Sequence, residues 1–153
     1  MSSVKKSQRL QVVVELREQQ EKQALQILGE CQRRHLEMQS QLDNLHKYRN
    51  DYQQQYQQMT RSGVNIQQLL DFRAFIDKLD QAVLSQQQAL QAAAVELEEK
   101  RLKWQAAHRQ TLGMQKIHAA ALQEEQQRIL KREQRETDEH ALRGGKNSGM
   151  ENA

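Results

Sequence analysis

Apolar side chains recur at alternating spacings of three and four residues along most of the chain. From Leu10 to Met59 the core positions of a heptad pattern are 10, 14, 17, 21, 24, 28, 31, 35, 38, 42, 45, 49, 52, 56 and 59. The polar exceptions are Arg17, Glu21, His35 and Arg49. Sustained alternation of this kind is typical of a coiled-coil helix. It predicts a first helix over residues 8–60.

A second pattern of the same kind follows a single break at residues 61–65. Its core positions are 69, 72, 76, 79, 83, 86, 90, 93, 97, 100, 104, 107, 111, 114, 118 and 121, with Gln86, Lys100, Thr111 and His118 as polar exceptions. The pattern predicts a longer second helix over residues 66–142. A short flexible lead over 1–7 and a disordered tail over 143–153 complete the expected organisation.

The break carries the signals of a tight reversal between two helices. Gly63 tolerates the left-handed backbone conformation that such turns often need. Asn65, with Gln68 three positions on, resembles a capping box that starts the second helix near Ile66. The predicted fold class is therefore all-α, a long two-helix antiparallel coiled coil (an α-hairpin) with its tip turn at 61–65. The longer second helix should extend past the start of the first from about Lys116 to His140, where it either frays or is covered by a partner.

Composition supports a helical rod over a globular domain. The chain contains no proline and only 4% aromatic residues, and Leu, Ile, Val and Phe make up about a fifth of it. A disordered chain is the alternative at this composition, but disorder usually accompanies a high net charge. Here the formal net charge is only +3 and the apolar residues are periodic.

Membrane insertion and secretion are not expected. The longest apolar run is Val12 to Val14, far short of the roughly 20 residues of a membrane span. The N-terminus lacks the apolar region of a secretory signal. The sequence predicts a cytosolic protein, which can still dock on a membrane-bound partner.

The residue types that carry chemistry do not gather in this sequence. The five histidines lack metal-ligand spacing, the single Cys31 cannot complete a zinc site or an internal disulfide, and no glycine-rich phosphate loop occurs. A two-helix rod also lacks the dry pocket that catalysis needs. We expect no enzyme activity, no catalytic or metal site, no cofactor and no small-molecule ligand.

Basic residues gather toward the end of the hairpin that holds both termini. Between residues 100 and 123 the charged side chains are all basic (Lys100, Arg101, Lys103, Arg109 and Lys116), and Lys5, Lys6 and Arg9 add to them from the first helix. A solvated helix face, an acidic protein partner and nucleic acid all fit such a patch. Nucleic acid is the least favoured, because Trp104 is the sole aromatic residue among these charges.

A stripe of residues near the turn departs from the core pattern. Gln41, Leu45, Tyr48 and Tyr52 follow helical spacing on the first helix, and Phe75, Leu79, Ala82 and Gln86 do so on the second. Tyr48 and Phe75 flank the core positions, where two helices cannot fully bury them. Exposed, clustered aromatic side chains favour a protein interface. The alternative is that both side chains lie flat over the packed interface between the two helices, which we call the seam, as an extension of the core.

These residues resemble a known family. Gln41-Leu42-x-x-Leu45-x-x-Tyr48-x-x-x-Tyr52, a loop with Gly63, and Phe72-x-x-Phe75-Ile76-x-x-Leu79-x-x-Ala82 resemble the flagellar export protein FliJ family over residues 38–90. The resemblance implies a hairpin similar to the γ stalk of rotary ATP synthases. It implies that the end with both termini inserts into the hexameric export ATPase FliI, and that the closed end meets the membrane export-gate protein FlhA. Export chaperones are further partners implied by the family.

The resemblance also implies candidate residues for each partner. The FlhA-binding residues would be Gln41, Leu45, Tyr48, Tyr52, Phe75, Leu79, Ala82 and Gln86. The FliI-binding residues would be Leu10, Val13, Val14, Leu16, Arg17, Lys116 and Arg128. The implied function is a non-enzymatic stalk that couples the ATPase to the gate during flagellum assembly, at the cytoplasmic side of the inner membrane. A virulence type III secretion stalk protein and a generic coiled-coil scaffold or chaperone are the alternatives. A scaffold would self-associate as a dimer, whereas the stalk should be a monomer in isolation.

Overall fold

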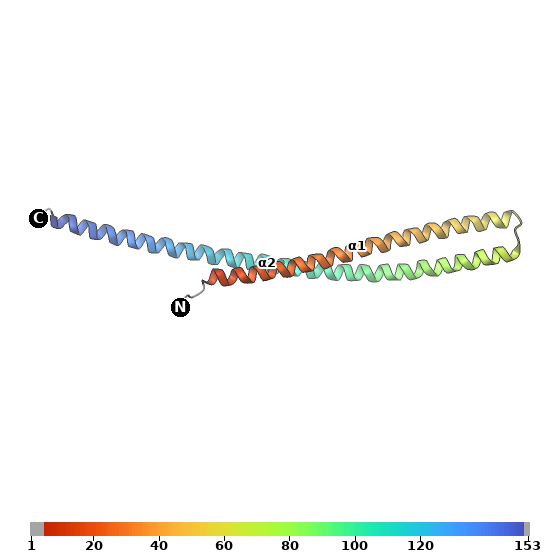
Figure 1. The fold of residues 1–153 in the computed structure, drawn as a ribbon, viewed down its shortest axis with the longest axis horizontal. Coiled ribbons are helices and arrows are strands. Elements are labelled where there is room, and N and C mark those ends of the chain that lie inside the picture. The colour runs from red at the N-terminus through yellow and green to blue at the C-terminus, as the bar shows by residue number, and fades with distance from the viewer. Residues whose placement is uncertain (1–4, 152–153) are drawn as a thin grey trace. The chain divides into compact units, whose positions relative to one another are not determined.

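The computed structural model describes residues 5–151 as two long helices joined by a short turn (Figure 1). Helix α1 spans Lys6–Arg61 and helix α2 spans Ile66–Glu151. The two helices pack against each other as a helical hairpin, and residues 5–151 contain no strand. The predicted all-α fold of two antiparallel helices is confirmed.

The helix bounds agree with expectation at the turn and differ at the C-terminal end. Helix α2 begins at Ile66 as predicted, but it continues to Glu151, so residues 143–151 of the expected disordered tail are helical. Gly144 and Gly145 lie inside this helix. Each glycine costs about 1 kcal/mol relative to alanine, yet helical backbone angles remain open to it, and no proline is present to end the helix. Residues 1–4 of the expected lead and 152–153 of the tail lie outside the described residues.

The heptad pattern identifies the packed face of each helix. Every predicted core position on both helices is buried or half-buried, including the polar exceptions. The buried apolar side chains are Val14, Leu28, Cys31, Leu42, Ile76, Ala93 and Ala121. No side chain within residues 5–145 falls below 2% exposure, because each helix covers only one face of the other.

The structure divides into two compact units, and each shows the antiparallel register by itself. The closed unit contains the turn and spans residues 22–106. Within it, Arg34 lies 3.8 Å from Glu96, and Arg49 forms a 2.7 Å ion pair with Asp80. In the second pair both residues lie closer to the turn than in the first pair, which is the order expected of antiparallel helices.

The open unit combines the start of α1, through Glu21, with α2 from Ala107 onward. Its interhelical hydrogen bonds extend from Glu21 and His108 to Ser7 and Glu125. Every side chain of α2 from 126 to 145 is then exposed. The unpaired part of α2 therefore begins after Glu125 and not near Lys116 as expected. The start of α1 at Lys6 instead of residue 8 explains only two of these residues, and the rest follows from the register, which places Ser7 beside Glu125.

The turn between the helices depends on two residues that the sequence had singled out. Gly63 has a φ of 72°, in the left-handed region that favours glycine. The side chain of Asn65 accepts a 3.1 Å hydrogen bond from the backbone amide of Gln67. Asn65 is thus the N-cap of α2, although its partner is the amide of Gln67 and not the amide of Gln68 that a capping box would use.

Candidate functional site: two protein-interaction surfaces

The eight residues predicted near the turn occupy one face of the closed unit, which we call the tip surface. Its members are Gln41, Leu45, Tyr48 and Tyr52 on α1, and Phe75, Leu79, Ala82 and Gln86 on α2. The side-chain amide of Gln86 donates a 3.2 Å hydrogen bond to the side-chain oxygen of Gln41 at one end of this face. At the other end, the rings of Tyr52 and Phe75 lie 4.7 Å apart. The antiparallel register places Leu45 and Tyr48 opposite Ala82 and Leu79 between these two contacts.

Exposure within the tip surface follows each residue's distance from the seam. Tyr48 is 60% exposed and Phe75 is 42% exposed. Leu45, Tyr52, Leu79, Ala82 and Gln86 are half-buried, and Gln41 is exposed. The half-buried members pack in or beside the seam, and the side chains of Tyr48 and Phe75 extend from the surface toward solvent. An arrangement of this kind suits the binding of a protein, because it presents apolar area on a rigid support.

Tyr52 holds the aromatic part of the tip surface in place. Its ring contacts Phe72 at 5.5 Å and 48° as well as Phe75 at 4.7 Å and 55°. Tilted aromatic pairs at such distances contribute about 0.5–1.5 kcal/mol beyond the area they bury. Tyr52 therefore fixes Phe75, whereas Tyr48 remains accessible on the same face.

Gln86 has a role that the heptad pattern alone does not assign. It occupies a core position, where its amide nitrogen lies 3.3 Å from the backbone carbonyl of Met38 and donates a hydrogen bond to it. A polar residue that finds its partners at only one alignment favours that register over others. Gln86 therefore links the alignment of the two helices to the tip surface.

The second predicted surface lies in the open unit, and the structure separates its members by exposure. Leu10, Val13 and Arg17 are half-buried and Val14 is buried in the seam, while Leu16 is 55% exposed. Lys116 is exposed, and Arg128 is exposed beside Glu124 at 3.6 Å. Val12 is 65% exposed next to them.

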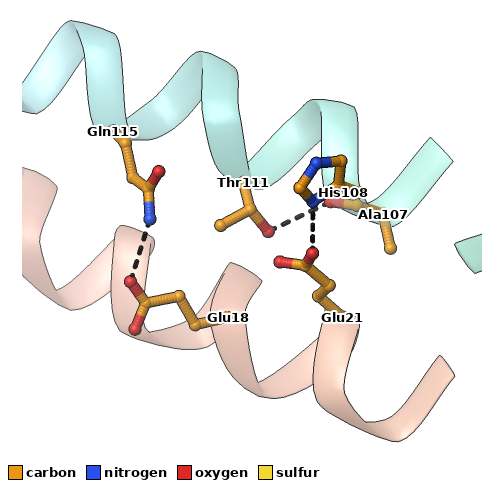
Figure 2. A network of polar contacts seen from close by, with 6 residues as sticks. All are labelled: Glu18, Glu21, Ala107, His108, Thr111 and Gln115. Atoms are coloured by element: carbon orange, nitrogen blue, oxygen red, sulfur yellow. Dashed lines mark hydrogen bonds and ion pairs between the residues drawn. The ribbon is translucent and has the colours of Figure 1, made fainter. Parts of the chain in front are cut away.

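A layer of polar contacts crosses the seam of the open unit. Of its members, the heptad pattern singles out only Glu21 and Thr111, as polar exceptions. Figure 2 shows Glu18 and Glu21 on α1 directed toward Gln115 and His108 on α2, with Thr111 between them. Gln115 donates a 3.2 Å hydrogen bond to Glu18, and His108 Nδ1 lies 2.5 Å from Glu21 Oε1. The buried hydroxyl of Thr111 donates to the carbonyl of Ala107 at 3.0 Å, within its own helix.

Arg17 adds to this polar layer from the seam itself. Its guanidinium donates to Gln20 at 3.2 Å and to Gln110 at 3.1 Å. With Arg17, Glu21 and Thr111 at core positions, the seam of the open unit buries fewer apolar side chains than a regular coiled coil of the same length. Since such helices depend on apolar burial, we expect this unit to be the less stable one.

Within residues 5–151, no group of three or more His, Cys, Asp and Glu side chains is placed to hold a metal ion. No helical stretch in that range is long and apolar enough to cross a membrane.

Comparison with known proteins identifies a family for the chain as a whole. A protein-family model described as "Flagellar FliJ protein" matches residues 6–149, which covers both helices almost completely. No curated protein and no solved structure matched the chain. The match extends the resemblance seen over residues 38–90 to nearly the full length. This chain belongs to the flagellar FliJ protein family.

Proposed function

We propose that this chain is the stalk that couples the hexameric export ATPase FliI to the export gate FlhA. Membership of the FliJ family makes the chain a component of the flagellar export apparatus, and the family is not a known enzyme family. The coupling role, the assistance to export chaperones and the position at the cytoplasmic face of the inner membrane are the parts that we infer. The observation that carries the proposal is this match together with exposed apolar side chains on both units.

At the open unit, the first turns of α1 support insertion into another protein. Leu10 and Val14 face the seam, while Val12 and Leu16 on other sides of the same helix are 65% and 55% exposed. A helix segment that is apolar on several faces is normally covered from more than one side. The wall of a ring would provide the second cover, as in the γ stalk of rotary ATP synthases.

At the closed unit, Tyr48 and Phe75 support binding to a gate protein. Both aromatic side chains are exposed on one rigid face. Aromatic residues are enriched at the centres of protein interfaces. The half-buried neighbours Leu45 and Leu79 would complete the apolar area. In this arrangement the two surfaces bind different partners at the same time.

The proposed contact with the ATPase is tested by measuring the hydrolysis rate and the oligomer size of the cognate export ATPase, with and without the full chain. Val12→Gln with Leu16→Gln should abolish stimulation of hydrolysis, because it removes exposed apolar area without touching the seam. Leu25→Gln with Leu36→Gln is the matched control, since these side chains are 51% and 68% exposed on the closed unit. Stimulation that survives the first pair, or is lost equally in both pairs, would refute this assignment.

The proposed contact with the gate is tested by measuring binding of the chain to the cytoplasmic part of the export gate and by swimming motility. Tyr48→Ala with Phe75→Ala should weaken binding by about tenfold or more, which is the effect of losing residues at the centre of an interface. Ile66→Ala with Leu70→Ala is the control, because both side chains are also exposed near the turn. Normal gate binding and motility in the Tyr48 and Phe75 variant would exclude the tip surface as the gate contact.

A further inference from the structure

A cluster of basic side chains lies where α2 leaves the start of α1, entirely within the open unit. A groove of about 470 Å³ is lined there by Lys5, Lys6, Arg9, Glu125, Arg128, Ile129 and Arg132. A neighbouring hollow is lined by Arg128, Lys131, Arg132 and Arg135. We call the seven cations of these two sites the basic groove: Lys5, Lys6, Arg9, Arg128, Lys131, Arg132 and Arg135.

The positive charge of the basic groove is only weakly compensated within the described residues. Glu125, the one carboxylate in its lining, already accepts two hydrogen bonds from Ser7. The one ion pair formed by a groove residue in the part of the chain that the structure describes joins Arg128 to Glu124 at 3.6 Å, with both side chains largely exposed. An exposed ion pair of this kind is weak and stabilises the structure little. The groove therefore retains most of its charge for a partner.

The cations on α2 have the spacing of a helix-binding face. Arg128, Lys131, Arg132 and Arg135 follow i, i+3, i+4 and i+7, so they share one side of α2 and span about 10 Å. Arg128, Arg132 and Arg135 also continue the heptad core positions beyond Glu125. The face that packs against α1 up to Glu125 thus becomes basic where α1 begins, and its side chains are exposed from 126 onward.

We propose that the basic groove binds an acidic helix of a partner protein, which continues the seam of α2 past the start of α1. The helix would carry Asp or Glu at heptad spacing toward Arg128, Arg132 and Arg135, with Lys5, Lys6 and Arg9 at its edge. Like charges at i, i+4 destabilise an isolated helix by a few tenths of a kcal/mol, so such a partner would also relieve repulsion within α2. The inference goes beyond the proposed function, because it concerns the chemistry of the partner's surface and not its identity.

A protein helix fits this surface better than a nucleic acid or a membrane does. Glu133 lies on another side of the same segment, and Glu136, Asp138 and Glu139 follow the basic residues at i+3 or i+4 from Arg132 and Arg135, so an extended anionic surface would meet these carboxylates as well. No aromatic residue follows Trp104 in the sequence, so base stacking has no support here. The segment also lacks the apolar face of a membrane-surface helix, since Leu130 is followed on its side by Gln134, Thr137 and Ala141.

The test is the binding of the full chain to a labelled, alanine-based helical peptide that carries glutamate on a single face, followed by fluorescence anisotropy. A peptide of the same composition with glutamate on all faces is the comparison. The single-face peptide should bind about tenfold more tightly. The variant with Arg128→Gln, Arg132→Gln and Arg135→Gln should lose about tenfold in affinity, since exposed ion pairs each contribute a few-fold.

A charge-matched control separates the groove from general attraction. Arg101→Gln, Lys103→Gln and Arg109→Gln remove the same number of positive charges elsewhere on α2 and should leave binding unchanged. Circular dichroism confirms that each variant keeps its helix content. Arg128→Glu with Arg132→Glu should in turn bind a peptide with lysine on a single face, which a variant with a merely damaged structure would not do.

Three results would overturn the inference. These are equal binding of both glutamate peptides, equal loss in the groove variant and the control variant, and tighter binding to a single-stranded oligonucleotide or to phosphatidylglycerol vesicles than to the single-face peptide. Stimulation of the export ATPase is measured separately on the same variants. A failure of the acidic-helix proposal is thereby distinguished from a failure of the stalk function.

Discussion

The side-chain hydroxyl of Ser7 donates a 2.7 Å hydrogen bond to the carboxylate of Glu125, which also accepts from the Ser7 backbone amide at 3.2 Å. The first turn of α1 contains no acidic residue of its own to stabilise its free amides. Glu125, on the opposite helix, supplies that carboxylate. The start of α1 is therefore fixed by the point on α2 at which pairing ends.

This contact predicts a pH dependence at the start of α1. The hydrogen bond from the Ser7 side chain, then that from its amide, lowers the pKa of Glu125, and the charges of Lys5 and Arg128 act in the same direction. A lowered folded-state pKa gives stability that is present above the ordinary carboxyl pKa and is lost as the pH falls through the lowered value. Ser7→Ala should raise the pKa of Glu125 toward its ordinary value, as followed by NMR of the side-chain carboxyl.

The control for this titration lies in the same helix. The pKa of Glu98 is lowered mainly by its hydrogen bond from Arg101 and does not involve Ser7. Its titration should be the same in the Ser7→Ala variant and in the unaltered chain. An unchanged titration of Glu125 in that variant would show that Ser7 does not set its pKa.

Glycine substitutions should have opposite effects at the turn and inside a helix. Gly63→Ala should lower the free energy of unfolding by about 1–2 kcal/mol, because Gly63 has a left-handed φ of 72°. Gly29→Ala should raise it by about 0.5–1 kcal/mol, since Gly29 lies within α1 with open space where a Cβ would be placed. Urea denaturation followed by circular dichroism measures both. The same sign of change in both variants would contradict the role assigned to Gly63.

The heptad seam predicts which leucines stabilise the hairpin. Leu42 is 6% exposed in the seam, so Leu42→Ala should lower the free energy of unfolding by about 2–4 kcal/mol. Leu36 is 68% exposed on the same helix, and Leu36→Ala should change it by less than about 0.5 kcal/mol. Equal losses in the two variants, measured by chemical denaturation, would be inconsistent with a single packed face on α1.

Gln86 should act on register at some cost in stability. Gln86→Leu should raise the free energy of unfolding by about 1 kcal/mol, because an apolar side chain would replace the bonds to Met38 and Gln41 in the seam. Gln87→Leu, at the next and exposed position, serves as the control and should change it little. Spin-label distances across the seam should broaden only in the Gln86 variant. A single, narrow distance distribution in the Gln86→Leu variant would show that Gln86 does not set the register of the two helices.

Sequence reasoning went furthest where one physical rule dominates. Apolar spacing of three and four residues predicted both helices, because burial of one stripe is the main stabilisation available to a chain with so few aromatic residues. It also predicted the positions of Leu42 and Ile76 in the seam. Gly63 and Asn65 predicted the turn, since few other residues adopt a left-handed φ or cap a helix equally well.

The remaining features depend on which residues face each other across the seam, and periodicity along one helix contains no information about that alignment. The bond between Ser7 and Glu125, the polar layer around Glu21 and His108, and the contacts of Gln86 all follow from the register. The sequence by itself determined that two helices pair, where they turn and which faces meet. Only the tertiary structure decided the partners, because a contact between residues distant in the chain forms only when both helices are in place.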